Sequence, residues 1–153
     1  MPVKFATEVT LGRLTKWLRL LGFDTCEESG RINESTPVPD RDRYRLTRTR
    51  KRYEQLQGNR RLFIQANEPA QQIREVIRAL NISKKDISPY SRCLVCNTLI
   101  EPVDRERVRY AIPDYIWEHC DKFCQCRHCR KIYWAGSHTE RGLKWINVLF
   151  EEQ

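Results

Sequence analysis

The chain has 153 residues, a formal net charge of +8 and a hydrophobic content of 40%. This length suits one compact domain with a small additional module and is too short for several large cores. No run of about 18 apolar residues is present, so the composition excludes a membrane-spanning helix.

The N-terminal segment has the pattern of a strand followed by an amphipathic helix. Apolar and polar residues alternate over 3–9, which predicts a strand. Thr10 is a predicted helix cap, and Gly22 is a predicted left-handed C-terminal residue of the same helix. The buried stripe of this helix is expected to comprise Leu11, Leu14, Trp17, Leu18 and Leu21. A strand that leads into a helix is the usual opening of an α/β unit.

The next segment, 24–43, is poor in apolar residues and is expected to be an irregular loop. Residues 44–47 and 61–65 are predicted strands. A second helix is expected to be capped by Asn67, to contain Pro69 in its first turn and to end near Asn81.

The composition changes after residue 88, where cysteines and aromatic residues become frequent. A short helix is expected over 113–120 and a strand over 131–134, and 143–150 is expected to pack as a terminal helix or strand. We therefore predict an α/β domain over 1–88 and a zinc-ribbon module over 89–153.

Two Cys-x-x-Cys pairs predict a metal site in the second segment. Each such turn directs two sulfurs at one point, and four thiolates suit a tetrahedral, closed and therefore structural Zn²⁺ site. Cys124 is a competing sulfur, and His128 and His138 lie nearby, but the regular spacing favours Cys126 over Cys124. The predicted ligands are Cys93, Cys96, Cys126 and Cys129.

The number of cysteines also bears on the cellular compartment of the protein. The count of seven is odd, and the first residues lack the apolar stretch of a secretory signal, so a disulfide framework is disfavoured. We expect a cytoplasmic protein with no membrane partner. Cys26 and Cys120 are expected to be packed thiols.

The positive charge lies in the N-terminal half. Residues 1–88 hold 18 Lys and Arg against 11 Asp and Glu, whereas 89–153 hold 10 against 9. Four thiolates with Zn²⁺ would make the second segment slightly negative. Such a field favours a polyanion as partner, and nucleic acid rather than a membrane.

Two groups of basic residues are candidates for contact with RNA phosphates, with Tyr44 and Tyr53 available to stack on bases. The alternative is that the tract is a solvated loop and that the basic stripe of the first helix, which also includes Arg19, simply faces solvent. The candidates are Arg13 and Lys16 in the helix, and Arg41, Arg43, Arg45, Arg48, Arg50, Lys51 and Arg52 in the tract.

Several segments together resemble the Mut-seven C-terminal RNase domain family. The N-terminal similarity lies in the Lys4-to-Glu8 strand and in the leucine-, arginine- and tryptophan-containing helix up to Thr25. The other similar segments are 46–48, 72–76, 92–97 and 133–138. The similarity covers most of the chain and is most specific over 92–138.

The resemblance implies a PIN-like α/β domain with a parallel sheet, in complete or reduced form, followed by a zinc ribbon. It also implies a ribonuclease that uses carboxylate-bound Mg²⁺ or Mn²⁺ to activate water. Glu8 aligns with the first family aspartate, whereas Thr49 stands where a second is expected, and the acidic helix between them is shortened or absent. The candidate catalytic residues are Glu8 and Asp24, and other acids that could be recruited are Glu27, Glu28, Asp40 and Asp42.

Three functions follow as hypotheses. The first is RNA binding by a PIN-like protein whose nuclease site is degraded. The second is an active metal-dependent endoribonuclease that uses Glu8. The third is a protein-interaction adaptor, for which an exposed Trp134 or Trp145 would be suitable.

Overall fold

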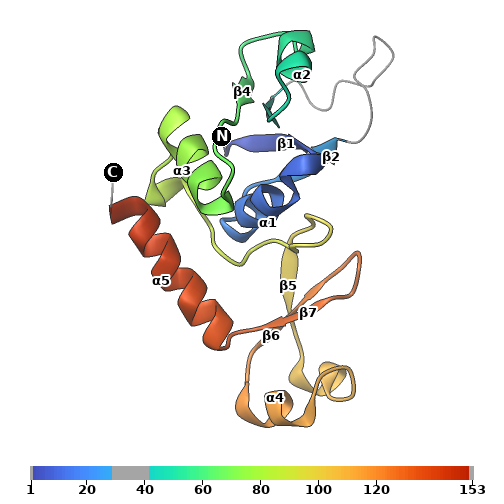
Figure 1. The fold of residues 1–153 in the computed structure, drawn as a ribbon. Helices are drawn as coiled ribbons and strands as arrows, with labels where there is room; N and C mark the ends of the chain where they lie inside the picture. Colours follow the sequence, from blue (N-terminus) through green and yellow to red (C-terminus); the bar gives the residue numbers. More distant parts are fainter. Residues whose placement is uncertain (1, 29–41, 152–153) are drawn as a thin grey trace.

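The computed structural model describes residues 2–28 and 42–151, which form two sheets and five α-helices (Figure 1). Arg41 and Asp40, which the sequence puts forward as site residues, lie outside the described residues. No helix of the described residues is long and apolar enough to cross a membrane.

The first sheet has four strands in the order β2-β1-β3-β4, and all neighbouring strands are parallel. The strands are β1 (Lys4–Glu8), β2 (Thr25–Glu28), β3 (Arg43–Thr47) and β4 (Arg61–Phe63). The predicted parallel α/β fold is therefore confirmed. Strand β2 corrects the expectation of an irregular loop, because its pairing with β1 outweighs its polar composition.

One face of this sheet carries the main core. Phe5 of β1 and Leu46 of β3 are almost fully buried and belong to it. This face is covered by α1 (Gly12–Leu20) and α3 (Pro69–Ala79), and α5 (Ser137–Glu151) contributes Ile146 and Leu149 to the same core cluster (Figure 1).

The other face of the sheet carries the short helix α2 (Arg50–Gln55), which the sequence did not predict. Tyr53 of α2 packs edge-on against Phe63 of β4, with ring centroids 5.8 Å apart. Helices therefore lie on both faces, and the strand order reverses between β1 and β3. In open α/β sheets, ligands bind outside the carboxyl ends of the strands at such a reversal.

The first helix ends as predicted but begins differently. A 3-10 turn over Val9–Leu11 precedes α1, and Thr10 caps nothing: its hydroxyl donates to the Glu8 carboxylate instead. The predicted left-handed residue is confirmed, because Gly22 has a φ of 95°. An added Cβ at Gly22 would lie 2.4 Å from the carbonyl oxygen of Ser88, so this position also requires the absence of a side chain.

The second helix of the main core, α3, contains the predicted Pro69 at its start, but its N-cap is Glu68 rather than Asn67. Asn81 follows the helix with a φ of 51°, as expected of a terminating residue. A 3-10 turn over Lys84–Asp86 then leads to the second sheet.

The second sheet is antiparallel and consists of β5 (Ile100–Val103), β6 (Phe123–Cys126) and β7 (Ile132–Trp134), in that order. Strand β7 was predicted, whereas β5 and β6 were not. The predicted short helix is α4 (Asp114–His119), which lies between β5 and β6. A small separate core is built around Val108, Ile112 and Phe123.

The chain returns from this ribbon to the main core through α5. Ile146 and Leu149 of this helix are buried in the same cluster as Phe5, and the ring of Trp145 lies 3.9 Å from that of Trp17. The last helix thus completes the core of the segment that was predicted to form the first domain (Figure 1).

Candidate nucleic-acid interface and metal cluster

Glu8 lies at the carboxyl end of β1, beside the point where the strand order reverses, and is 5% exposed. Its Oε1 accepts hydrogen bonds from the Thr10 hydroxyl at 2.8 Å and from the Arg48 amide at 2.7 Å. Its Oε2 accepts from the hydroxyls of Thr47 at 2.9 Å and Thr49 at 3.2 Å. Four donors therefore surround this carboxylate.

These donors determine the ionisation of Glu8. Burial by itself would raise the pKa of this carboxyl group, but the Arg48 amide and the three hydroxyls outweigh burial and lower the pKa. The carboxylate is therefore ionised, and its lone pairs are directed at protein donors.

The residues around Glu8 do not fit a Mg²⁺ or Mn²⁺ site, which needs several oxygen ligands that are mostly anionic. Thr49 adds a hydroxyl donor rather than a second carboxylate. Glu28 pairs with Glu8 in the strand register, but its oxygens are held by Arg45 at 2.9 Å and Arg52 at 3.1 Å. Within the described part of the chain, no group of three or more acids or histidines converges there.

The structure does not bring Asp24 together with Glu8. Asp24 directly precedes β2, and so lies at the amino edge of the sheet. Arg43 donates to both of its carboxylate oxygens, at 2.8 and 3.0 Å, and the Asn97 amide donates at 2.7 Å. Burial would raise the pKa of Asp24, but these donors outweigh it and lower the pKa.

The predicted basic residues divide into two groups. Arg43, Arg45 and Arg52 are half-buried in the ion pairs just described. The exposed ones are Arg13 and Lys16 in α1, and Arg48, Arg50 and Lys51 at the start of α2. Because α1 and α2 both begin at the carboxyl edge of the sheet, Arg13 lies at the same edge as the α2 group.

The two tyrosines expected to stack on bases are instead covered by arginines. The guanidinium of Arg60 lies 5.5 Å from the ring centroid of Tyr44, and that of Arg61 lies 4.6 Å from that of Tyr53. Both tyrosines are half-buried. The face of each ring that an arginine covers is therefore not open to a base.

The predicted cysteine cluster is confirmed. The four sulfurs lie within 4.8 Å of one another; the Cys93 and Cys129 sulfurs are 3.5 Å apart, and those of Cys96 and Cys126 are 3.2 Å apart. A tetrahedral site with metal–sulfur bonds of about 2.3 Å places its sulfurs about 3.8 Å apart, so the cluster fits a four-thiolate metal site. Cys124 is not part of the cluster.

The two cysteine turns have the same local structure. In each, the amide of the first cysteine, Cys93 or Cys126, donates to the carbonyl five residues later. The residue after the second cysteine, Asn97 or Arg130, has a left-handed φ of 71° or 66°. This repeated geometry directs both pairs of sulfurs at one point.

Neighbouring groups shift the pKa values of three of these cysteines in different directions. Burial would raise the pKa of Cys93, but hydrogen bonds with Tyr133 and backbone amides lower it. A backbone hydrogen bond at Lys131 would lower the pKa of Cys129, but burial and hydrogen bonds with the other three sulfurs raise it to about 11. Hydrogen bonds with Thr98 lower the pKa of Cys96 to about 6. The Tyr133 hydroxyl lies 3.1 Å from the Cys93 sulfur and accepts from the Leu94 amide at 3.0 Å. Burial and the adjacent Cys93 raise the pKa of Tyr133, so its hydroxyl keeps the proton that it can donate to sulfur.

The first cysteine turn is attached to the amino edge of the parallel sheet. Asn97 accepts from the Thr25 amide at 2.9 Å, and Arg19 donates to the carbonyls of Leu94 at 3.0 Å and Val95 at 3.1 Å. Arg19 is 7% exposed, so it does not belong to the solvent-facing stripe in which the sequence placed it. Helical periodicity could not reveal this role, because the partner carbonyls lie about 75 residues further along the chain.

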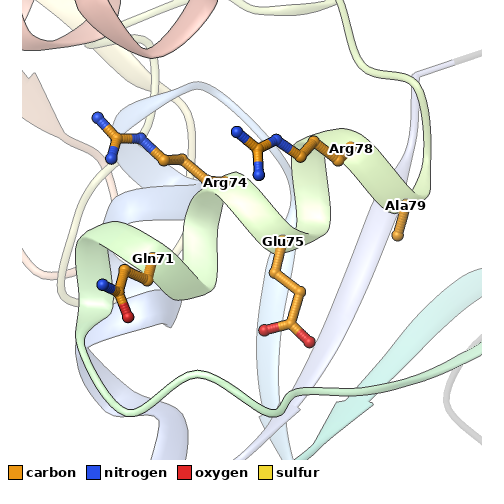
Figure 2. A pocket seen from close by; sticks show the side chains of 5 residues that line it. All are labelled: Gln71, Arg74, Glu75, Arg78 and Ala79. Carbon is orange, nitrogen blue, oxygen red and sulfur yellow. The ribbon is translucent and has the colours of Figure 1, made fainter. Parts of the chain in front are cut away.

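A groove lies along α3 (Figure 2). Glu75 points away from Arg74 and Arg78, and it accepts from the Gln65 and Ala66 amides at 2.9 and 3.1 Å. The groove is lined by Gln71, Arg74, Glu75, Arg78 and Ala79, and none of these is a predicted site residue.

Comparison with known proteins gives one match. The sequence model described as the Mut7-C RNAse domain matches residues 3–146, which is nearly the whole chain. No curated protein and no solved structure matches.

Proposed function

The chain belongs to the Mut7-C RNAse domain family, and from this premise we propose that it binds RNA at the carboxyl edge of its parallel sheet without cleaving it. Membership supports a nuclease-like, RNA-related role. The absence of cleavage is a proposal that depends on the residues of this particular chain.

The observation that carries the proposal concerns the carboxyl edge of the parallel sheet, where ligands of such sheets bind. Hydroxyl groups and cations lie there, in place of the acids that a metal-dependent nuclease needs. Glu8 retains a carboxylate, but protein donors occupy it. Arg48, Arg50 and Lys51 are exposed beside it. Cations at this position attract phosphate groups and repel a divalent metal ion.

Binding to a short single-stranded RNA, measured by fluorescence anisotropy over a range of salt concentrations, tests the first part. We expect the double variant Arg50→Ala/Lys51→Ala to bind more weakly. Its slope of log affinity against log salt should be smaller by about 1.4, because each phosphate contact on a single strand accounts for about 0.7.

The matched control is Lys84→Ala/Lys85→Ala, which removes the same charge from an exposed 3-10 turn. This turn is followed by Ser88, whose amide bonds to Leu21 at the other end of α1. Equal losses in the two variants would indicate a nonspecific charge effect and would contradict the proposed interface.

Cleavage is tested by incubating end-labelled RNA with the protein and Mn²⁺, beside Glu8→Gln. We expect no cleavage by either protein. Cleavage by the wild type that Glu8→Gln abolishes would establish the alternative, an active endoribonuclease.

We also propose that the four-cysteine cluster holds Zn²⁺ in a structural role. Four sulfur ligands suit this metal and leave no coordination position for substrate. The hydroxyl of Tyr133 would stabilise one thiolate from outside the ligand sphere.

The adaptor hypothesis receives no support from the tryptophans on which it depended. Trp145 stacks on Trp17, and Trp134 packs against the small ribbon core, so both are half-buried. A pull-down with and without nuclease treatment would distinguish direct protein partners from RNA-bridged ones.

A further inference from the structure

Through its carboxylate, Glu8 joins the 3-10 turn before α1 to the segment between β3 and α2. Its donors come from the 3-10 turn before α1 (Thr10), the end of β3 (Thr47), the following backbone (Arg48) and the residue preceding α2 (Thr49). Thr47 is fully buried, and its hydroxyl oxygen also accepts from the Thr49 amide at 3.1 Å. The carboxylate is thus the common acceptor for the segment that leads into α2.

Helix α2 needs a nearby negative charge because the residues of its own first turn are unfavourable at a helix N-terminus. Its first residues, Arg50, Lys51 and Arg52, are all cationic, and its first turn contains no acid. Cations are unfavourable at the positive end of a helix dipole. The N-cap residue Thr49 makes no capping bond, since its hydroxyl is turned toward Glu8.

The two nearby acids have different partners. Glu28 forms ion pairs with Arg45 and Arg52, which neutralise it. Among the described residues, Glu8 has no such ion pair, and its donors are hydroxyls and one backbone amide. Its full negative charge therefore remains next to the N-terminus of α2, where it stabilises a six-residue helix that is too short to form alone.

We propose that Glu8 is a positioning residue: its carboxylate replaces the missing N-terminal charge and cap of α2, and so holds Arg50 and Lys51 at the RNA-facing edge. In this role Glu8 needs no metal ion. The inference rests on the proposed function in one respect only, namely that the positioned helix contacts RNA.

Hydrogen exchange followed by mass spectrometry tests this role directly. In Glu8→Gln we expect amides of 48–55 to exchange about tenfold faster than in the wild type, as expected for loss of hydrogen bonds to a charged acceptor. The control is Glu54→Gln, which removes one exposed acid from α2 itself and should leave these amides unchanged.

A second variant covers the case in which Glu8→Gln does not fold. Thr49→Val keeps the carboxylate and the shape of the side chain but removes one donor, so exchange over 49–55 should rise by a smaller factor. Unchanged exchange in the variants that fold would overturn the proposal.

Mn²⁺ binding, followed by electron paramagnetic resonance and by thermal shift, separates positioning from metal ligation. We expect Mn²⁺ to produce the same spectral change and the same shift of melting temperature in the wild type and in Glu8→Gln, each compared with its own metal-free sample. Mn²⁺ binding that the substitution abolishes would overturn the proposal in favour of a metal ligand.

RNA affinity is measured on the same variants. Weaker RNA binding by Glu8→Gln, with the global melting temperature retained, supports positioning. If the wild type binds no RNA, the proposed function fails, while hydrogen exchange and Mn²⁺ binding still decide the role of Glu8.

Discussion

At the scale of single residues, the two acids predicted as catalytic, Glu8 and Asp24, lie at opposite edges of the parallel sheet. Glu8 faces the carboxyl edge of the sheet, whereas Asp24 binds Arg43 and Asn97 at the amino edge. Asp24 therefore joins the first sheet to the first cysteine turn. Its ionised carboxylate contributes to stability rather than to a reaction site.

We expect Asp24→Asn to lower the free energy of unfolding by about 1–3 kcal/mol, because Arg43 loses its counter-charge. The lowered pKa of Asp24 also predicts a pH effect. Its stabilisation is complete above the ordinary value of about 3.9 and is lost as the pH falls below it. Urea unfolding at several pH values measures both effects. Asp121→Asn, at an exposed position, is the control, and an equal loss there would contradict the assigned role.

Gly22→Ala tests the left-handed turn after α1. The φ of 95° costs a residue with a side chain about 1–3 kcal/mol, and the contact with the Ser88 backbone adds to this cost. Gly58 is the control, because it also has a positive φ but has open space around its Cα. In thermal unfolding, Gly22→Ala should be destabilised more than Gly58→Ala; equal losses would mean that the close contact is unimportant.

At the scale of elements, the structure links the end of the chain to its beginning. Leu149 of α5 is 2% exposed and packs into the same core as β1, whereas the neighbouring Val148 is 42% exposed. The predicted boundary near residue 89 does not reflect this contact, because an amphipathic helix does not reveal which core it covers.

We expect Leu149→Ala to cost about 2–5 kcal/mol in the free energy of unfolding, as is usual for a buried leucine. Val148→Ala, one residue earlier in the same helix, should change it by about 0.5 kcal/mol or less. Chemical denaturation of both variants provides the comparison. A small effect of Leu149→Ala would show that α5 is not docked on the core in solution.

At the scale of the whole molecule, the cysteine cluster holds the ribbon together and the ribbon contacts the first sheet. The core around Val108, Ile112 and Phe123 is small, so we propose that a metal ion bound by the four cysteines supplies much of the folding free energy of this segment. Hydrogen bonds of Arg19 and Asn97 connect the first cysteine turn to the amino end of β2, so the structure of this turn affects that end of the strand.

Removal of the metal with a chelator should therefore unfold residues 91–135 and also increase hydrogen exchange around Thr25. Cys93→Ser should lose the metal, whereas Cys124→Ser, outside the cluster, should retain it. Metal content by atomic absorption and hydrogen exchange measure the two effects. Full metal content in Cys93→Ser would contradict the ligand assignment, and unchanged exchange at Thr25 would contradict the coupling.

Sequence patterns alone were sufficient to predict the four-cysteine cluster, the first and third α-helices and the α/β character of the N-terminal segment. These features depend on spacing within a short stretch of chain: two cysteines per turn, an apolar stripe with helical period, and a glycine where φ must be positive. The start of α1 and the existence of β2 were predicted wrongly, because the Thr10 hydroxyl and the edge of β1 have tertiary partners that local patterns do not contain.

The roles of the charged residues could be assigned only from the folded structure. Arg19, Arg43, Arg45 and Arg52 have the same appearance in the sequence as Arg50 and Lys51, yet the first four are held by carbonyls or carboxylates from other elements. The physical reason is that an ion pair or hydrogen bond depends on atoms within about 3 Å, whatever their separation along the chain. For the same reason Glu8 could be recognised as an acid from the sequence, but the four donors that occupy it could not.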